Sequence, residues 1–513
     1  RRIALNIQRI NSGEKASGIG VKMISKEELV INMATARQIK YSPAWETLSE
    51  AVLINEERDD ISRSVSIFSA IEEGLANNLD IAIARNEVDV VAADVKIAKA
   101  GLLPDLSVSG SHSIVDETTA ETSFGQSPEH RGLASAELEQ VIYSEQVSAN
   151  KRIQQYLFSA QEAAQEVQSL DVVLDVSTSY LNLMQAKTEE RIQRDNLDVT
   201  RKNLELARVS SSLGQSGPSD LYRWQGEIAT AKSDLLNATA QRKQAELALN
   251  QILNRPVDEE FNTVEVDLED ARLAINNENI NSYVSNPVAF HRFGDFMVDR
   301  ANRITPDLRQ IDYNIKAQER TLKQNQRVQY IPNLSVSGGY NYELYRSGAG
   351  TDFSAVTGEL NDWNWNVSVG ASIPIFQGFS RDAQVQQARV QVLQLNNERL
   401  NTSRLINQDV RSNLESIRAS YTNIQLTKDA ETAVVKNFEL VQDAYSKGTV
   451  TITQLLDAQN AAISAQLNSA NAIYVFLIDL LQMERAAGSF YMLYTEEQKA
   501  AFILELTDFF NNP

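Results

Sequence analysis

The 513-residue sequence predicts a mainly α-helical protein that also carries the strands of a transmembrane β-barrel. Three observations predict this fold class. The chain contains an internal repeat, it has two very long segments without a helix-breaking residue, and it has four short runs in which apolar and polar residues alternate. Only 21 glycines and 10 prolines interrupt the chain, so its elements must be long.

The repeat centres on five letters, LSVSG, that follow a proline at two places in the chain. "LPDLSVSG" occupies residues 103–110 and "IPNLSVSG" occupies residues 331–338. Each copy follows an amphipathic helical pattern, at 78–104 and at 305–332, that begins near an aspartate and ends at the proline. The agreement of these flanking patterns indicates a duplicated unit.

The same order of elements follows each copy of LSVSG. Two alternating runs, separated by a polar segment, precede a long helical segment, 144–213 or 381–447, that contains no glycine or proline. Each long segment ends near a glycine, and a further helix begins beyond it. The sequence therefore predicts two units of helix–hairpin–long helix–helix, at 66–256 and 305–488. Three segments lie outside the units: the N-terminal extension 1–65, the acidic connector 257–304 and the C-terminal tail 489–513.

The first long helix carries an interrupted coiled-coil seam. A heptad register that runs from Ile153 to Leu213 places Ile, Leu, Val or Ala at most seam positions, with Asp171, Thr178 and Lys202 among the exceptions. A seam rich in small residues suits helices that pack side by side in a sheet or tube.

The alternating runs predict four strands, at about 105–115, 133–143, 333–345 and 363–375. In the second unit the apolar residues fall on one face of each strand, and serine, asparagine and glutamate fall on the other. Aromatic residues gather at one end of that apolar face: Tyr340, Tyr342, Trp363 and Trp365. This combination is typical of strands that face lipid with an interfacial aromatic girdle. For a single run taken alone, a soluble sheet with one wet face is the alternative.

The chain does not reach the roughly 20 consecutive apolar residues of a membrane-spanning helix. The best candidate, residues 473–481, is short and contains Asp479. One chain supplies about four strands, whereas membrane barrels need about eight or more and leave no edge unpaired. We therefore expect several chains to share one barrel.

Composition argues against several other classes of protein. A net charge of −20 disfavours nucleic-acid binding, and the absence of cysteine removes disulfides, zinc–thiolate sites and cysteine nucleophiles. The three histidines are His112 in a predicted strand, His130 in a predicted loop, and His291, and none has metal-ligand spacing to another ligand. We expect no catalytic residue, no metal, no cofactor and no enzyme activity.

The order of elements resembles the TolC family of outer-membrane efflux and secretion ducts. The resemblance rests on the two P-x-L-S-V-S segments, on "PIFQGF" at 374–379 and on "YSKGTVTITQLLDAQNA" at 445–461. It implies a homotrimer in the outer membrane of a Gram-negative bacterium. Three chains with four strands each would close a 12-stranded transmembrane β-barrel, and the long helices would form an α-helical barrel in the periplasm. The extension, connector and tail would lie around the equator of that helical barrel.

The resemblance also implies a function and partners. The chain would be the passive exit conduit, from periplasm to exterior, of a tripartite efflux pump or a type I secretion system. Its partners would be a periplasmic membrane-fusion adaptor and an inner-membrane pump of the RND, ABC or MFS type. The adaptor would dock at the tip formed by the two glycine turns, whose residues are Leu213, Gly214, Gln215, Lys447, Gly448 and Thr449.

Members of this family narrow the periplasmic entrance with aspartates just after these turns. Asp220 and Asp457 match such aspartates, and Tyr445 matches a tyrosine of the same entrance. Two positions depart from the family: Gln454 replaces an aspartate, and Val450 stands where well-studied members have an arginine. We expect Asp220 and Asp457 to place six carboxylates, two from each of three chains, around a pore mouth where they attract cations. The alternative is that each acid only stabilises a helix start, as an N-cap or first-turn residue.

Two readings from other classes remain open. A flagellin-like filament protein also has long cysteine-free helices, but it should lack strands with a tryptophan and tyrosine girdle. A soluble pore-forming toxin would carry a hydrophobic helical hairpin. Sedimentation with outer membranes and a compact trimer in detergent would distinguish the duct from both.

Overall fold

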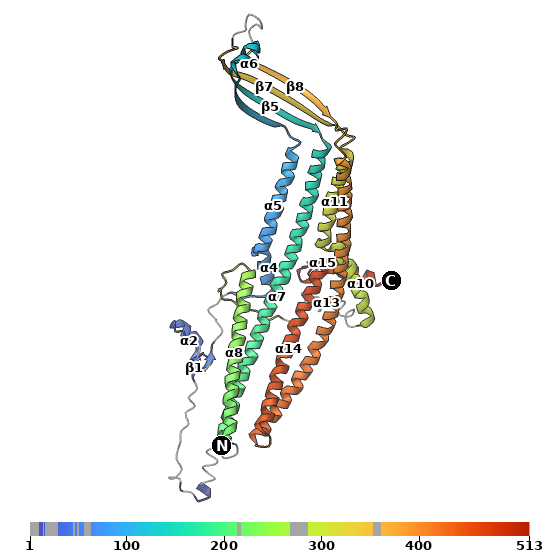
Figure 1. Cartoon of the computed structure of the whole chain (residues 1–513). Helices are drawn as coiled ribbons and strands as arrows, with labels where there is room; N and C mark the ends of the chain where they lie inside the picture. Colours follow the sequence, from blue (N-terminus) through green and yellow to red (C-terminus); the bar gives the residue numbers. More distant parts are fainter. Residues whose placement is uncertain are drawn as a thin grey trace.

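The computed structural model describes residues 10–13, 15, 29–44, 47–48, 51–55, 63–212, 217–266, 286–351 and 361–511. Figure 1 shows an elongated molecule with a β-sheet at one end and long helices that run away from it. Shorter elements gather around the middle of the helical part. The predicted fold class, a mainly α-helical protein with two long β-hairpins, is confirmed.

Each half of the chain contains the predicted helix, hairpin, long helix and further helix in that order. The first half comprises α4 (Ile67–Asn77), α5 (Leu79–Ala100), β4 (Asp105–Ile114), α6 (Glu117–Thr122), β5 (His130–Tyr143), α7 (Glu145–Ser212) and α8 (Pro218–Ile252). The second comprises α10 (Pro287–Ile304), α11 (Pro306–Arg327), β7 (Asn333–Ser347), β8 (Trp363–Ser372), α13 (Ser380–Ser446) and α14 (Ile452–Ala486). The short helices α4 and α6, and α10 in the predicted connector, were not predicted. The remaining elements are β1 (Val30–Asn32), α2 (Met33–Gln38), β2 (Val52–Ile54), β3 (Ser64–Val65), β6 (Asn262–Thr263), η3 (Tyr491–Leu493) and α15 (Glu496–Asn511).

The four long strands form one antiparallel sheet in the order β4-β5-β7-β8. The two hairpins meet where β5 pairs with β7, and this ladder contains a register shift between Gly132 and Leu133. β4 and β8 are the edges of the sheet, and among the described residues no strand pairs with their outer sides. The sheet is therefore open on both sides within one chain.

The register gives the sheet two chemically different faces. One row across the strands is apolar and aromatic: Val108, Ala136, Tyr340 and Trp365. The next row, on the opposite face, is polar: Ser109, Ser135, Asn341 and Asn364. In the polar row Ser135 Oγ lies 2.7 Å from Asn341 Oδ1, and Asn341 Nδ2 donates to Asn364 Oδ1 at 3.0 Å. The apolar face is bare, since Val108 is 79% exposed, and such a face is stable only against another apolar phase.

The aromatic residues expected to form the girdle come together on this apolar face. Tyr340 lies opposite Trp365, and Tyr342 lies opposite Trp363. The rings of Tyr340 and Trp363 are stacked with centroids 6.3 Å apart.

Two strands extend beyond their predicted bounds. β5 begins at His130 and β7 continues to Ser347, because these strands keep pairing as far as His130 opposite Ser347. The expectation that His130 lies in a loop is wrong. It is the first residue of β5 and faces Ile114 of β4.

The two long helices are the frame of the helical part. α7 has 68 residues, or about 100 Å at 1.5 Å per residue, and α13 has 67. α7 packs against α5 and α11 near the sheet and against α8 and α14 farther away (Figure 1). α13 packs against α11 and α14. Along each long helix, one set of shorter helices packs near the sheet and another packs farther from it.

The shorter helices meet end to end at the middle of the molecule. At the start of α5, Asn78 Nδ2 donates to the Ile252 carbonyl oxygen at the end of α8, at 2.9 Å. At the other junction Gly488 has φ +79°, and a Cβ there would lie 2.9 Å from Thr305 Cα. Only glycine permits this approach of α14 to α11. Across the junction Arg485 Nε donates to Asp171 at 2.5 Å, and Arg485 Nη1 pairs with Asp307 at 3.3 Å.

The predicted heptad seam of α7 does not hold along its whole length. At the far end Lys202 is exposed, whereas Asn203 and Ala207 are fully buried. A straight α-helix drifts by about 20° per heptad relative to a strict seven-residue repeat. A register set at Ile153 therefore leaves the contact face after several heptads.

The main apolar core lies at the middle of the molecule, where α4, α7, α10, α14 and α15 contribute buried side chains. Tyr180 of α7 is fully buried there, with its hydroxyl 2.5 Å from the Val264 carbonyl oxygen and 3.0 Å from that of Val65. These carbonyls adjoin the parallel pair of β3 and β6. Burial raises the pKa of Tyr180 to about 12, so the hydroxyl keeps the proton that it donates.

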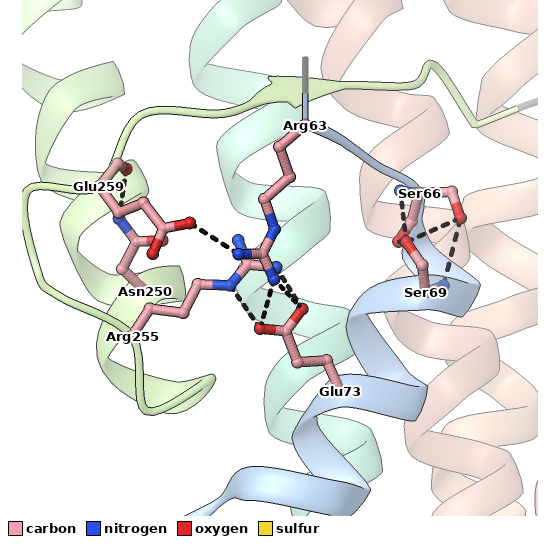
Figure 2. Close-up of polar contacts among 7 residues, drawn as sticks. All are labelled: Arg63, Ser66, Ser69, Glu73, Asn250, Arg255 and Glu259. Carbon is pink, nitrogen blue, oxygen red and sulfur yellow. Dashed lines mark hydrogen bonds and ion pairs between the residues drawn. The ribbon is translucent and has the colours of Figure 1, made fainter. Parts of the chain in front are cut away.

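Ion pairs stabilise the same middle region of the molecule, as Figure 2 shows. The Glu73 carboxylate of α4 accepts from Arg255 Nε at 2.6 Å, pairs with a second Arg255 nitrogen, and accepts from Arg63 Nη2 at 2.9 Å. Arg63 also donates to Glu259 at 2.7 Å. The hydrogen bond from Arg255 holds the pKa of Glu73 below its usual value. This cluster ties the start of the first unit to the segment that follows α8.

One helix of the described residues, α14, is long and apolar enough to cross a membrane by length and composition, with a mean hydropathy of 1.3. The sequence analysis expected none. A single such helix is weak evidence for a span, and α14 packs against α13 and α7 in the helical part.

Candidate functional site at the helical tip

The end of the helical part farthest from the sheet contains the last turn of α7, the start of α8 and the corner between α13 and α14 (Figure 1). The predicted docking residues Leu213, Gly214 and Gln215, between α7 and α8 in the sequence, lie outside the described residues. In the α13–α14 corner the predicted docking residues Lys447, Gly448 and Thr449 are exposed.

The α13–α14 corner has the hydrogen bonds of a Schellman motif. Gly448 N donates to the Tyr445 carbonyl at 2.9 Å, and Thr449 N donates to the Ala444 carbonyl at 3.1 Å. Gly448 has φ +75°, a left-handed conformation that glycine adopts at low cost. The corner is therefore fixed by its sequence, with Lys447 and Thr449 on its outside.

A small apolar cluster holds the helices of the tip together. It contains Trp224 of α8, Tyr445 of α13 and Leu455 of α14, and Trp224 and Leu455 are fully buried. Tyr445 is only 8% exposed, so its ring packs between helices. Burial is the main cause that raises the pKa of Tyr445, and the negative charge of Asp220 adds to it. Of the residues expected at the constriction, Tyr445 is thus the one that packs inside the tip.

The two expected acids differ in their relation to the helix starts. Asp220 lies in the first turn of α8, three residues after the N-cap Gly217, where negative charge is favourable without any pore. Asp457 is the sixth residue of α14, beyond the first turn, and is exposed. Stabilisation of the helix start can therefore explain Asp220 but does not explain Asp457.

Gln454 has a structural partner. Thr451 is the N-cap of α14; its backbone N–H donates to Gln454 Oε1 at 2.9 Å, and Thr451 Oγ1 accepts from Gln454 N at 3.4 Å. This is a capping box. The Gln454 side chain is thereby turned back onto its own helix start.

A buried polar network connects α13 and α14 to α7 next to the tip. We call it the polar clasp: Asn196, Thr200, Asn203, Gln442 and Gln459. Gln459 Nε2 donates to Asn196 Oδ1 at 2.8 Å and to Thr200 Oγ1 at 2.7 Å. Its Oε1 accepts from Asn203 Nδ2 at 3.0 Å, and Asn203 Oδ1 accepts from Gln442 Nε2 at 2.8 Å. Gln459 is 2% exposed, so each bond replaces water that the closed packing excludes.

The sequence analysis did not identify the clasp. Its members are amides and a threonine within glutamine- and asparagine-rich helices, where most such residues are solvated. The available signal was the row Asn196, Thr200 and Asn203, spaced by four and three residues beside the predicted seam. If the pattern had been read with the periodicity of a straight α-helix instead of a strict seven-residue repeat, this row would have fallen on the buried face of α7.

The described residues contain no group of three or more His, Asp or Glu side chains arranged to hold a metal ion. The described part of the tip offers an exposed helix corner at Lys447–Thr449 and the exposed carboxylate of Asp457. Those properties suit a surface that binds another protein and an entrance that favours cations.

Comparisons with known proteins agree with this architecture. Residues 70–255 and 298–489 match the family described as "Outer membrane efflux protein". The outer membrane protein TolC of Escherichia coli (strain K12) is 22% identical over 444 residues, which cover 84% of this chain and 83% of that protein. The outer membrane protein TolC of Vibrio cholerae is 22% identical over 452 residues, covering 87% of this chain and 94% of that protein.

The fold is also found among solved structures. The CmeC outer membrane channel of Campylobacter jejuni superposes with a TM-score of 0.65 at 17% identity, and the match covers 86% of this chain and 89% of CmeC. Because the family match spans well over half of the sequence, the chain belongs to the outer membrane efflux protein family: it is an outer-membrane duct whose helices extend into the periplasm.

Proposed function

We propose that three copies of this chain form one passive exit duct for a tripartite efflux or secretion assembly. The observation that carries the proposal is the open sheet, with unpaired edges at β4 and β8 and a bare apolar face. Edge N–H and C=O groups have no water partner in hydrocarbon, and four strands cannot close on themselves. Pairing β4 of one chain with β8 of the next removes every edge, and three chains with four strands each give a barrel of 12.

The helical part supports the same arrangement. α5 exposes Ile83, Val90 and Ile97, spaced seven residues apart, and α13 exposes Leu393 and Leu400 with the same spacing. Their exposed fractions lie between 50% and 69%. Matching heptad stripes on two helices suit a coiled-coil contact between neighbouring chains. Burial of each such side chain stabilises the contact by about 1.5–3 kcal/mol.

The direct test is the mass and conductance of protein purified from outer membranes. We expect a detergent-stable trimer that forms ion-conducting channels in planar bilayers. A monomer that remains in the soluble fraction, or a filament that sediments without detergent, would refute the duct.

At the periplasmic entrance we propose that Asp220 and Asp457 form a ring of six carboxylates. Support comes from the exposed position of Asp457, which no helix start explains. The double variant D220N/D457N should lose most of the cation preference of the channel and its block by divalent cations. The matched control is D234N, which removes an exposed carboxylate elsewhere on α8. Equal selectivity in D234N and D220N/D457N would contradict the ring.

We propose that the adaptor docks at Lys447–Thr449 and that an inner-membrane pump supplies the energy, while this chain only conducts. The exposure of these residues on a rigid Schellman corner supports the docking site. Capture of the adaptor by immobilised trimer should fall in the K447E/T449E variant, while the single-channel conductance stays unchanged. K436E, an exposed lysine farther up α13, is the control. Undiminished capture by K447E/T449E would contradict docking at this corner.

We further propose that the polar clasp holds the tip closed. Widening the entrance requires α13 and α14 to move away from α7, and that motion separates the partners of Gln459 and Asn203. Arg223 Nη1, which donates to Thr453 Oγ1 at 2.7 Å between α8 and α14, would restrain the same motion.

A further inference from the structure

Two of the three histidines lie together at the end of the sheet that is remote from the helices. The rings of His112 and His130 are parallel within 6°, with centroids 5.8 Å apart. The Tyr345 hydroxyl lies 2.5 Å from His112 Nδ1. We call His112, His130 and Tyr345 the outer histidine cluster.

The register places this cluster on the apolar face of the sheet. His112 lies opposite Gly132, and Gly132 lies opposite Tyr345, in a row that shares its face with Val108. The arginines at this end, Arg131 and Arg346, lie one position away and therefore on the other face. His112 and His130 are thus the basic side chains that the described strands present on the apolar face.

The cluster is a built arrangement and not a chance contact of surface side chains. A Cβ at position 132 would lie 2.4 Å from Tyr345 Cε1, so glycine is required for the tyrosine ring to cross the strand. A tyrosine hydroxyl that donates to Nδ1 leaves the neutral imidazole with its proton on Nε2. With Tyr345 as the donor, the one N–H of the neutral His112 ring lies at Nε2, and none of the described residues accepts it.

His130 is oriented from the loop side of the cluster. Its Nε2 lies 4.0 Å from Glu129 Oε1, while Glu129 Oε2 accepts from the Ala349 backbone N–H at 2.8 Å. The carboxylate is thus held by the loop backbone beside the His130 ring. Together the two imidazoles offer N–H donors to an anionic oxygen.

The position along the strands indicates where that oxygen comes from. The next residues toward the helices on this face are Tyr342 and Trp363, part of the aromatic set that marks a membrane interface. The cluster lies just beyond them, at the depth of lipid headgroups. We propose that His112 and His130 bind the phosphate group of a lipid in the outer leaflet. This rests on the proposed duct, with the apolar face toward lipid and the loops outside.

The test is a fluorescence titration of the detergent-solubilised trimer, because Trp363 and Trp365 lie on the same face. The probe is a short-chain phosphatidic acid, with inorganic phosphate, short-chain diacylglycerol and Zn²⁺ as separate arms. H112Q/H130Q should bind phosphatidic acid roughly tenfold more weakly, as expected for loss of a hydrogen bond to a charged group. H291Q, which removes the third histidine from α10, is the matched control and should bind like the wild type.

The arms separate the possible ligands. Tight binding of phosphatidic acid, with weak binding of diacylglycerol and inorganic phosphate, supports a headgroup site. Equal affinity for inorganic phosphate would overturn it in favour of a free-anion site, and Zn²⁺ binding lost in H112Q/H130Q would overturn it in favour of a metal site. Unchanged affinity in H112Q/H130Q, measured on trimers that still conduct, would overturn the headgroup site but leave the duct intact.

Discussion

Replacing Gln459 with alanine should open the periplasmic tip. The substitution removes the two hydrogen bonds donated by Gln459 Nε2 and the one accepted by its Oε1. It leaves Asn196, Thr200 and Asn203 without these partners inside the packed tip. In the open state, where α7 has separated from α14, the same groups form hydrogen bonds with water. The substitution therefore destabilises mainly the closed state.

The magnitude follows from the three bonds. Each contributes about 1 kcal/mol net, so the closed state loses roughly 3 kcal/mol per protomer. Since about 1.4 kcal/mol changes an equilibrium tenfold, the ratio of open to closed conformations should rise roughly 100-fold for each protomer. Packing defects around the shortened side chain add to this value.

The assay is single-channel recording in planar bilayers. Wild-type protein without adaptor should show small, mostly closed conductance, whereas Q459A should show a larger conductance and a higher open probability. The control is N460A, which removes an exposed amide one residue away. If Q459A and N460A conduct alike while both remain folded trimers, the clasp does not hold the tip.

Three further predictions concern the stability of the helical part. Burial raises the pKa of Glu484 to about 8, whereas its unfolded value is near 4.5, so the folded state keeps a proton that the unfolded state loses. Glu484 therefore contributes its full stabilisation below about pH 4.5, and this contribution is lost as the pH rises toward 8. The melting temperature of the E484Q variant should fall less over this pH range than that of the wild type, and an unchanged pH profile would contradict the assignment. Y180F should cost about 1 kcal/mol and raise hydrogen exchange in β3 and β6, and unaltered exchange there would count against the bridging hydroxyl. G448A should destabilise the α13–α14 corner by about 1 kcal/mol, because alanine is strained at the positive φ of position 448. The measurement is proteolysis at the tip, which should be faster in G448A, and equal cleavage rates would contradict the predicted strain.

The elements that the sequence predicted correctly are those with a strong periodic signal. In β8 the alternation of Trp363, Trp365 and Val367 with polar residues has period two, and lipid on one face makes that contrast large. α7 and α13 were predicted correctly because neither segment contains a glycine or a proline. The Schellman corner at Gly448 follows from local sequence alone, since its hydrogen bonds span only a few residues.

The features that the sequence did not predict depend on distant partners. Arg255 and Glu73 are 182 residues apart, and neither has a local pattern that marks it as part of a buried ion pair. The extension of β5 back to His130 depends on pairing with β7 beyond a register shift beside Gly132, where the ring of Tyr345 lies close to the strand. The polar clasp was not predicted because a strict heptad register has already left the true contact face of α7 at the position of Asn203. Long-range packing, and not propensity, decides these positions.

The central claim is that neighbouring chains share the edges β4 and β8. The chain contains no cysteine, so V108C combined in turn with V367C, V369C or A371C offers one thiol on each edge, all on the apolar face. A disulfide forms only when Cα atoms approach within about 7 Å. On oxidation in intact outer membranes, one of these registers should give a ladder that ends at a covalent trimer, and the single-cysteine variants should not. Absence of cross-links in every register, with the protein still folded, would contradict the shared barrel.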